Sequence, residues 1–332
     1  MPPKILLIGQ GVAGTLLAWS LQKRGAEVHI ADANLAGSST PPAAGIINPV
    51  TGKRFVKSEQ FETWYTCART TYCELEVELN QTFWENRPIL RLLGTAEEAN
   101  DWSIRCAQAE YSEHLAEIPD AGAWSPLLKT GFTFGLIQQA ARVQLKELTM
   151  AFRQKMTQKG YFSPEKIEYS DVQTLLKTYD QIVFCEGWQA TENPYFPESG
   201  FRVSKGEALL LQFAEPPDAT LPVPMLKKTM LLTPLADNLF WAGSTYRWHF
   251  DDTLPSADGR AYMESYLREM FAVPFEVVDQ VAGIRPTMIQ RNPVVAQSTV
   301  NSHVFMLNGL GTKGALLAPY FAEQMADKMS YL

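Results

Sequence analysis

The fold of this chain is decided by residues 4–14, which read KILLIGQGVAG. Lys4–Ile8 is a short apolar run that ends at a glycine, which is typical of a buried parallel strand. Val12–Arg24 then has the pattern of a helix, and Glu27–Ala31 is a second strand with Asp32 at its end. This order of elements predicts a compact β-α-β unit at the start of the chain.

The turn between this strand and this helix has the spacing Gly-x-Gly-x-x-Gly. Gly9 makes the tight turn, Gly11 lets the backbone approach a pyrophosphate, and Gly14 lets the helix pack on the strand. Val12 and Ala13 lie at the helix N-terminus, whose partial positive charge faces phosphates. We therefore expect these five residues to bind a dinucleotide; a glycine-rich turn without a ligand is the alternative.

Asp32 indicates which dinucleotides suit the unit. It lies 18 residues after Gly14, where a carboxylate accepts hydrogen bonds from ribose hydroxyls. A carboxylate there repels a 2′-phosphate, so NADP is the least expected ligand. FAD and NAD share this pattern, and other parts of the chain must distinguish them.

A second glycine turn near the end of the sequence favours FAD. Residues 309–314 read GLGTKG, after the apolar strand 304–307 and before a helix over 315–329. A flavin gains from such a turn because a helix N-terminus stabilises the negative charge of its reduced form. A strand-to-helix turn without a ligand is the alternative. The candidate FAD contacts here are Gly309, Gly311, Thr312, Lys313 and Gly314.

Composition bounds the possible partners. Of the 332 residues, 46% are hydrophobic and 20% are charged, which is ordinary for a globular protein of two sub-domains. The net charge of −7 disfavours nucleic acid as a partner. The four cysteines show neither CxxC spacing nor a paired histidine, so we expect no metal site and a cytoplasmic location. The uncharged run 5–22 contains three glycines, which suit a strand turning into a helix better than a membrane span.

Farther along, the pattern predicts helices over residues 58–80 and 138–159. Residues 200–250 have the short runs of antiparallel strands. Residues 34–57 form a long loop rich in Gly, Ser and Pro, and a loop of this length is usually functional or disordered.

Several segments, taken with the two glycine turns, resemble the D-amino-acid oxidase and glycine oxidase superfamily of FAD enzymes. The likeness extends along nearly the whole chain, and it is specific because the segments occur in the family's order and spacing. The family more often has Glu where this chain has Asp32. The matching segments are the loop STPPAAGIINP (39–49), VFCEGW (183–188), KGE (205–207), GIRP (283–286) with Asn292-Pro293, and residues 309–314 with Leu317-Ala318-Pro319.

The resemblance implies an α/β fold (α+β overall), in which a Rossmann-like FAD-binding domain is interleaved with an antiparallel-sheet substrate domain. The FAD domain would be formed by residues 1–57, 131–203 and 283–332, and the substrate domain by residues 58–130 and 204–282. FAD would be bound non-covalently. Ala44 and Gly45 would lie along the flavin, and Gly187 beside the pyrophosphate.

The resemblance also implies candidate catalytic residues. Arg285 would bind a substrate carboxylate, with a structural salt bridge as the alternative. Lys313 stands where relatives often have Arg, and it lacks the bidentate fork of a guanidinium. Tyr246 belongs to the stretch GSTYRWH (243–249), which forms either the wall of a pocket near the flavin or an edge strand that meets solvent. The catalytic roles of Tyr246, Arg247, Trp248 and His249 stay open.

The reaction implied is oxidation of a C–N bond in a small amine or amino acid by hydride transfer to flavin N5. The resulting imine hydrolyses, and oxygen or another acceptor takes the electrons. Two alternatives stay open: a tRNA-modifying FAD oxidase, and a flavin-binding protein without turnover.

We predict that the purified protein is yellow and carries one non-covalent FAD per chain, because two glycine turns and Asp32 together suit this dinucleotide. Heat or acid should release the pigment for identification by chromatography. Release of NAD, or failure to take up any nucleotide on reconstitution, would contradict the prediction.

Overall fold

A computed structural model describes residues 2–52, 54–218, 220–236 and 238–330. The predicted β-α-β unit is present as β1 (Lys4–Ile8), α1 (Val12–Lys23) and β2 (Glu27–Ala31). β1 pairs in parallel with β2 on one side and with a strand from the middle of the chain on the other. The first unit therefore lies at the centre of a larger sheet.

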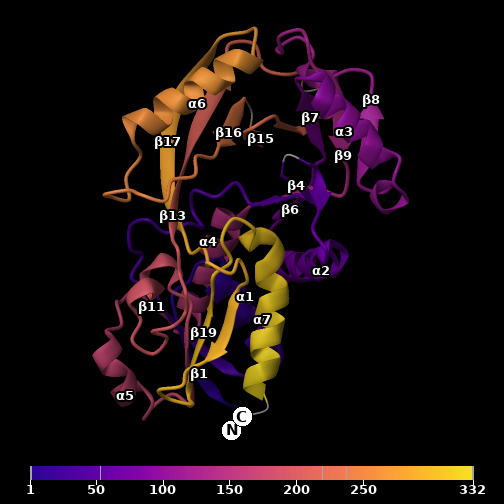
Figure 1. Ribbon diagram of the computed structural model, residues 1–332. Coiled ribbons are helices and arrows are strands. Elements are labelled where there is room, and N and C mark those ends of the chain that lie inside the picture. The colour runs from indigo at the N-terminus through magenta and orange to yellow at the C-terminus, as the bar shows by residue number, and fades with distance from the viewer. Residues whose placement is uncertain (1, 53, 219, 237, 331–332) are drawn as a thin grey trace.

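That sheet has six strands in the order β11-β2-β1-β12-β19-β18. Helices α1 and α7 pack together beside it, and Figure 1 shows both running along the lower half of the molecule. α4 joins the same apolar core, and a second core lies where β1 and β12 meet residues 167–196. The elements not yet given are β11 (Phe162–Ser163), β12 (Gln181–Phe184), β18 (Val294–Gln297), β19 (Val304–Asn308), α4 (Leu145–Gln158) and α7 (Gly314–Ser330).

A second sheet of eight strands forms the upper half, in the order β17-β13-β16-β15-β14-β7-β9-β8. Its pairs are antiparallel except β14 with β7, and α6 (Ala257–Met270) packs on β13. This confirms the antiparallel sheet expected from residues 200–250. The strands are β7 (Ile89–Leu93), β8 (Leu115–Ile118), β9 (Thr133–Ile137), β13 (Ser204–Phe213), β14 (Met225–Lys227), β15 (Leu231–Ala236), β16 (Leu239–Gly243) and β17 (Phe275–Arg285).

Short strands and one long helix complete the fold. β3 (Ile46–Ile47), β10 (Ala141–Val143) and β6 (Trp84–Asn86) form a three-stranded sheet, and β4 (Val50–Thr51) pairs with β5 (Val56–Lys57). α2 (Phe61–Leu79) packs on α7, and α3 (Ala96–Cys106) packs on β7 and β8. Short helical turns, α5 (Val172–Leu175) among them, connect the rest.

One expected helix was wrong at its start. The pattern predicted a helix over residues 138–159, whereas α4 begins at Leu145 and residues 141–143 form β10. Gln139 has a left-handed backbone, with φ of 50°, which interrupts a helix. Val143 donates its amide hydrogen to Gly45 O at 2.8 Å, so the loop from the start of the chain holds this segment as a strand.

The division into two domains stays a proposal. β1, β2, β12 and β19 come from the segments that we assign to the FAD domain, and β13 to β16 from those of the substrate domain. β9 belongs to the eight-stranded sheet although residues 131–203 were assigned to the FAD domain. Met1, Lys53, Ala219, Asp237, Tyr331 and Leu332, which the proposed ranges include, lie outside the described residues.

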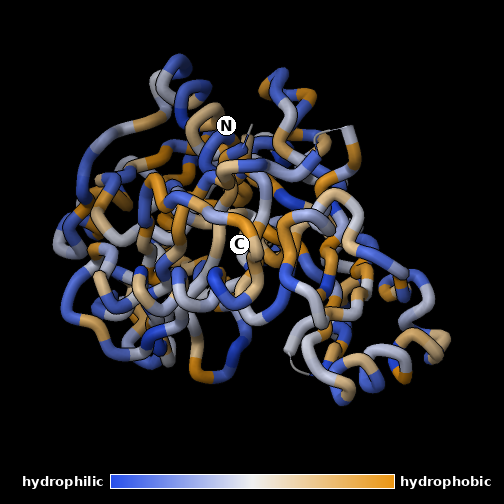
Figure 2. The backbone as a smooth tube through the Cα atoms, turned by 90° about the horizontal axis from the view of Figure 1, so that it is seen from above, coloured by the Kyte–Doolittle hydropathy of each residue, from blue (hydrophilic) through white to orange (hydrophobic). Residues whose placement is uncertain are grey.

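Hydrophobic and hydrophilic residues alternate over short stretches of the backbone (Figure 2). In the described part of the chain, no helix is long and apolar enough to cross a membrane.

Gly45 offers a test of how the long loop is held. Its φ is 71°, and a Cβ there would lie 1.8 Å from Val143 O. Gly52 has a similar φ of 78°, but nothing lies within 4 Å of its Cβ position. We expect Gly45→Ala to lower the free energy of unfolding by about 2–4 kcal/mol, because a clash adds to the left-handed strain. Gly52→Ala should cost only about 1 kcal/mol.

Urea denaturation of both variants measures this difference. Equal losses would show that the contact between Gly45 and Val143 is looser than the structure has it.

Candidate functional site

A cavity of about 1260 Å³ lies between the two large sheets. It exceeds the roughly 300–1,000 Å³ of ordinary small-molecule sites, so it has room for a dinucleotide and a small second molecule. The carboxyl ends of β1, β2, β12 and β19 open into one end, which is where parallel α/β sheets bind ligands. Strands of the eight-stranded sheet line the other end.

The first glycine turn is closed by backbone on both sides. A Cβ at Gly9 would lie 2.5 Å from Cys185 O, at the end of β12, and a Cβ at Gly14 would lie 2.1 Å from Gly9 O. Gly9 also has φ of 100°, which a larger residue rarely adopts. These two glycines let β1, α1 and β12 converge, and Gly9 and Gly11 then line the cavity.

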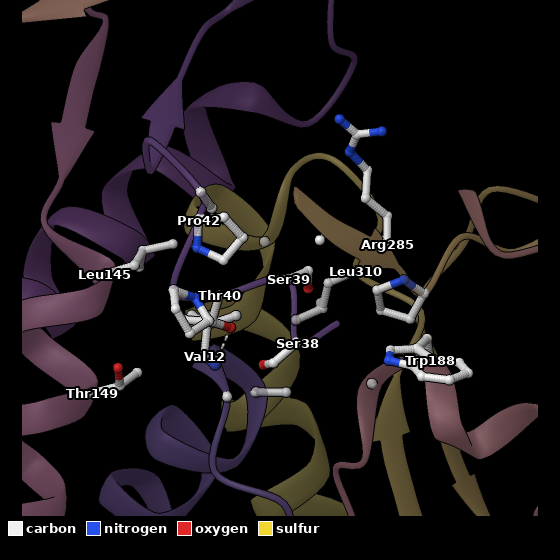
Figure 3. Close-up of a pocket in the computed structure, with 18 of the residues that line it drawn as sticks. Val12, Ser38, Ser39, Thr40, Pro42, Leu145, Thr149, Trp188, Arg285 and Leu310 are labelled. Atoms are coloured by element: carbon white, nitrogen blue, oxygen red, sulfur yellow. Dashed lines mark hydrogen bonds between the residues drawn. The ribbon is translucent and has the colours of Figure 1, made fainter. Parts of the chain in front are cut away.

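The loop that follows β2 covers the N-terminus of α1. Val12 donates its amide hydrogen to Thr40 Oγ1 at 3.1 Å, as Figure 3 shows. A Cβ at Gly11 would lie 3.0 Å from the same oxygen. Trp241 Nε1 of the eight-stranded sheet donates to Pro42 O of this loop at 2.9 Å. The loop thus contacts the dinucleotide end and the opposite sheet together.

Asp32 lines the cavity at the end of β2, as expected. Its carboxylate accepts hydrogen bonds from the amides of Gln10 and Asn34. Arg153 Nη2 of α4 lies 3.4 Å from Asp32 Oδ1, and Arg153 Nε donates to Gln10 Oε1 at 2.6 Å. Arg153 lines the cavity but could not be predicted, because nothing local marks a surface-like helix residue as part of a cavity.

The two glycine turns meet in this cavity. Gly14 and Gly309 do not line it; a Cβ at Gly309 would lie 2.6 Å from Met288 Cγ, so this glycine permits close packing. Lys313 lines it and donates from Nζ to Ser58 Oγ at 2.8 Å, and burial lowers the pKa of Lys313. The predicted cofactor residues that line it are Gly9, Gly11, Val12, Ala13, Asp32, Ala44, Gly45, Gly187, Gly311, Thr312, Lys313 and Gly314.

Arg285 lies at the end of β17 and lines the opposite part of the cavity, where Figure 3 shows its guanidinium pointing away from Val12. Its Nη2 donates to Ser244 Oγ at 2.6 Å and to Thr245 O at 3.1 Å. Gly206 makes room for it, because a Cβ there would lie 1.9 Å from Nη2.

Among the described residues, the guanidinium of Arg285 has no anionic partner. None of the salt bridges among the described residues includes it, and its buried Nη1 has no acceptor there. Burial lowers the pKa of Arg285, which expresses the cost of a charge removed from water. A structural ion pair, the alternative that we considered, is therefore not found in the described ranges.

Tyr246 does not line the cavity. Its ring centroid lies 5.1 Å from Arg285 Cζ, and its other neighbour is Trp248, with ring centroids 4.9 Å apart. Tyr246 is 46% exposed and Trp248 is 38% exposed. The stretch 243–249 thus contributes Gly243 and Ser244 to the lining, and its aromatic rings pack outside Arg285.

Comparison with known proteins identifies the family. Residues 4–328 match the family described as FAD dependent oxidoreductase. The chain belongs to this family. FAD is thus the dinucleotide of its cavity, and the lining fits: the crossing at Gly9, the helix start at Gly11 and the Asp32 carboxylate suit a pyrophosphate and a ribose.

Individual relatives of this FAD-dependent oxidoreductase are distant. A tRNA 5-methylaminomethyl-2-thiouridine biosynthesis bifunctional protein, MnmC, of Marinobacter nauticus is 24% identical over 98% of this chain, which spans only 55% of that protein. The solved iminodiacetate oxidase of Chelativorans superposes with a TM-score of 0.79 at 19% identity, covering 98% of this chain and 95% of that one. Glycine oxidase of Bacillus cereus superposes with a TM-score of 0.78 at 18% identity, covering 99% of this chain and 95% of that one. The structural likenesses show a shared fold.

Glu186, which follows β12 at the cofactor end of the cavity, has a raised pKa. It lines the cavity and accepts a hydrogen bond from Asn193 Nδ2 at 2.8 Å. Burial raises the pKa of Glu186 from 4.5 to about 7, so the carboxyl group is largely protonated in mildly acidic solution. A neutral group beside Gly9 also avoids placing negative charge next to the phosphates of a dinucleotide.

We predict that Glu186 makes the apoprotein less stable as the pH rises. The native carboxyl group keeps its proton up to about pH 7, whereas the unfolded chain loses it near 4.5. The free energy of unfolding therefore falls by up to about 3 kcal/mol between these values and then levels off. Glu186→Gln should remove this pH dependence. The free energy of unfolding of the variant should therefore rise relative to that of the wild type between pH 5 and pH 8.

Denaturant unfolding at both pH values measures the gain, with the exposed Glu192→Gln as the matched control. A constant difference between wild type and Glu186→Gln would contradict the prediction.

Proposed function

We propose that this oxidoreductase oxidises a C–N bond in a small amino acid or amine whose carboxylate is bound by Arg285. The observation that carries the proposal is a guanidinium that lines the cavity without an anionic partner among the described residues. An unpaired buried charge destabilises a protein, and a carboxylate from a ligand would offset that cost. Nη1 has no acceptor among the described residues, and a ligand carboxylate that reached it would supply one.

The charges around Arg285 favour a substrate amine that binds uncharged. The acidic lining residues other than Glu207 lie in the segments that connect elements around the six-stranded sheet. Its carboxylate is already held by Ser256 and Gln280. A protonated amine would meet the positive charges of Arg285 and Lys313 without a counter-ion, so the neutral amine is preferred. Its lone pair then assists the loss of hydride from the adjacent carbon.

Bound FAD supplies the two-electron acceptor, and the protein supplies orientation and electrostatics. Arg285 fixes the carboxylate, and Gly206 and Gly243 leave the sheet beside it without bulky side chains. Lys313 and the N-terminus of α7 bring positive charge to the same cavity, which suits negative charge that develops there. The imine product hydrolyses in water, and oxygen or another acceptor takes the electrons.

The structural relatives support this substrate class through their names. Iminodiacetate and glycine, named in their titles, each combine an amine with a carboxylate. The family match by itself supports only FAD-dependent oxidation.

A second candidate is suggested by the MnmC relative, whose name refers to 5-methylaminomethyl-2-thiouridine in tRNA. An aminomethyl group on a nucleoside also contains a C–N bond of the required kind. The net charge of −7 weighs against a polyanionic substrate. Anaerobic mixing of the oxidised protein with small amino acids, amines and tRNA separates the candidates, since only a substrate bleaches the flavin colour. If none of these compounds bleached it, a flavin-binding protein without turnover would be favoured.

We predict that Arg285→Ala lowers kcat/KM for an amino-acid substrate by about 30-fold to several thousand-fold, because a charge-assisted bidentate pair is lost. Arg285→Lys should restore only part of it, since an ammonium cannot reproduce the fork. The flavin spectrum should barely change.

Anaerobic reduction rates and melting temperatures measure these effects, with Arg291→Ala as the exposed control. The carboxylate contact would be refuted if Arg285→Ala melted at a lower temperature while the flavin of its folded fraction was still reduced by the amino acid at the wild-type rate.

A further inference from the structure

Lys227 is a further cation that lines this cavity, and no salt bridge among the described residues includes it. It ends β14 and lines the cavity together with Leu231 of β15. Lys227 is half-buried, and burial and the nearby charge of Arg91 lower its pKa to about 8. Within the described ranges, its ammonium has no hydrogen bond and no salt bridge. Glu98, an acid near these strands, pairs with Arg91 at 3.3 Å.

The register of the sheet relates Lys227 to Arg285. Directly paired positions run Lys227–Leu231, Leu231–Gly243, Gly243–Ala208 and Ala208–Val281, and all of these residues line the cavity. They share one face because paired residues in a sheet point to the same side. Apart from Lys227, this row carries only apolar side chains or none.

Arg285 lies on the same face as this row, four residues after Val281 on β17. Its guanidinium reaches back to Ser244, which follows Gly243 of β16. β16 and β14 are separated by one strand, so the backbones of Lys227 and Gly243 lie roughly 10 Å apart across the sheet, at about 4.8 Å per strand. A small molecule with an anionic group at each end spans such a distance.

We propose that Lys227 binds a second anionic group of the substrate, so that the molecule oxidised here carries two carboxylates. One is held by Arg285 and the other by Lys227. This inference rests on the proposed function and specifies its substrate class as a dicarboxylic amine or amino acid. The apolar and small residues between the two cations accommodate the carbon chain that joins the carboxylates.

Unreactive anions test the two-cation arrangement without turnover. Malonate, succinate and glutarate are compared by titration calorimetry with propionate, butyrate and valerate, their monocarboxylates of equal length, on the FAD-loaded protein. The best dicarboxylate should bind at least about thirtyfold more tightly than its monocarboxylate. Equal affinities in the wild type would overturn the proposal.

Variants assign the preference to Lys227. Lys227→Met should reduce dicarboxylate affinity to that of the monocarboxylate and leave monocarboxylate affinity unchanged, whereas Arg285→Ala should weaken both. Lys228→Met is the matched control, because Lys228 Nζ lies over Phe132 and Tyr266, at 5.1 and 6.0 Å from their ring centroids, and does not line the cavity. Retention of the preference in Lys227→Met would overturn the proposal.

Folding provides a separate check. Since Lys227 has no partner among the described residues, Lys227→Met and Lys227→Gln should melt at the wild-type temperature or above. A marked loss of stability in both variants would show that the protein itself holds the ammonium, which contradicts the proposal.

Anaerobic reduction by iminodiacetate, compared with N-methylglycine, separates this inference from the proposed function. Reduction by N-methylglycine without any dicarboxylate preference leaves the proposed function standing and overturns the role of Lys227. A dicarboxylate preference with no reduction by any amine supports the two-cation site and refutes the proposed chemistry.

Discussion

The cavity depends on how closely the end of β12 passes the turn after β1. Cys185 O occupies the space that a side chain at residue 9 would need, and Gly9 O occupies the space of a side chain at residue 14. Because both positions are glycine, α1 starts directly behind the crossing and presents its N-terminus to the cavity. A bulkier turn would move the helix away from the strand ends, and the phosphate-binding geometry would be lost.

The loop after β2 carries this constraint to the other sheet. Thr40 accepts a hydrogen bond at the start of α1, Pro42 accepts one from Trp241, and Gly45 accepts one from Val143. Three separate parts of the chain are thus fixed by one short segment. The cofactor end and the substrate end of the cavity thus keep a fixed position relative to each other. This does not require a direct contact between the two large sheets.

Much of the cofactor end could be predicted from sequence because its signals are local. The spacing of Gly9, Gly11 and Gly14 and the apolar run before them depend on neighbouring residues only. The start of α4 was wrong because Val143 is held by Gly45, about a hundred residues earlier. Lys227 escaped notice for a similar reason: its place opposite Arg285 depends on the register of five strands, which no local pattern encodes.

The order of strands in the six-stranded sheet has a consequence for how the chain folds. β1 pairs with β12, which lies about 175 residues later, and β12 pairs with β19, more than a hundred residues later again. The apolar side of α1 is completed by α7. During synthesis the first β-α-β unit must therefore wait, with apolar surface exposed, until β12, β19 and α7 have been made. Such non-local pairing slows folding and lengthens the time in which nascent chains can aggregate.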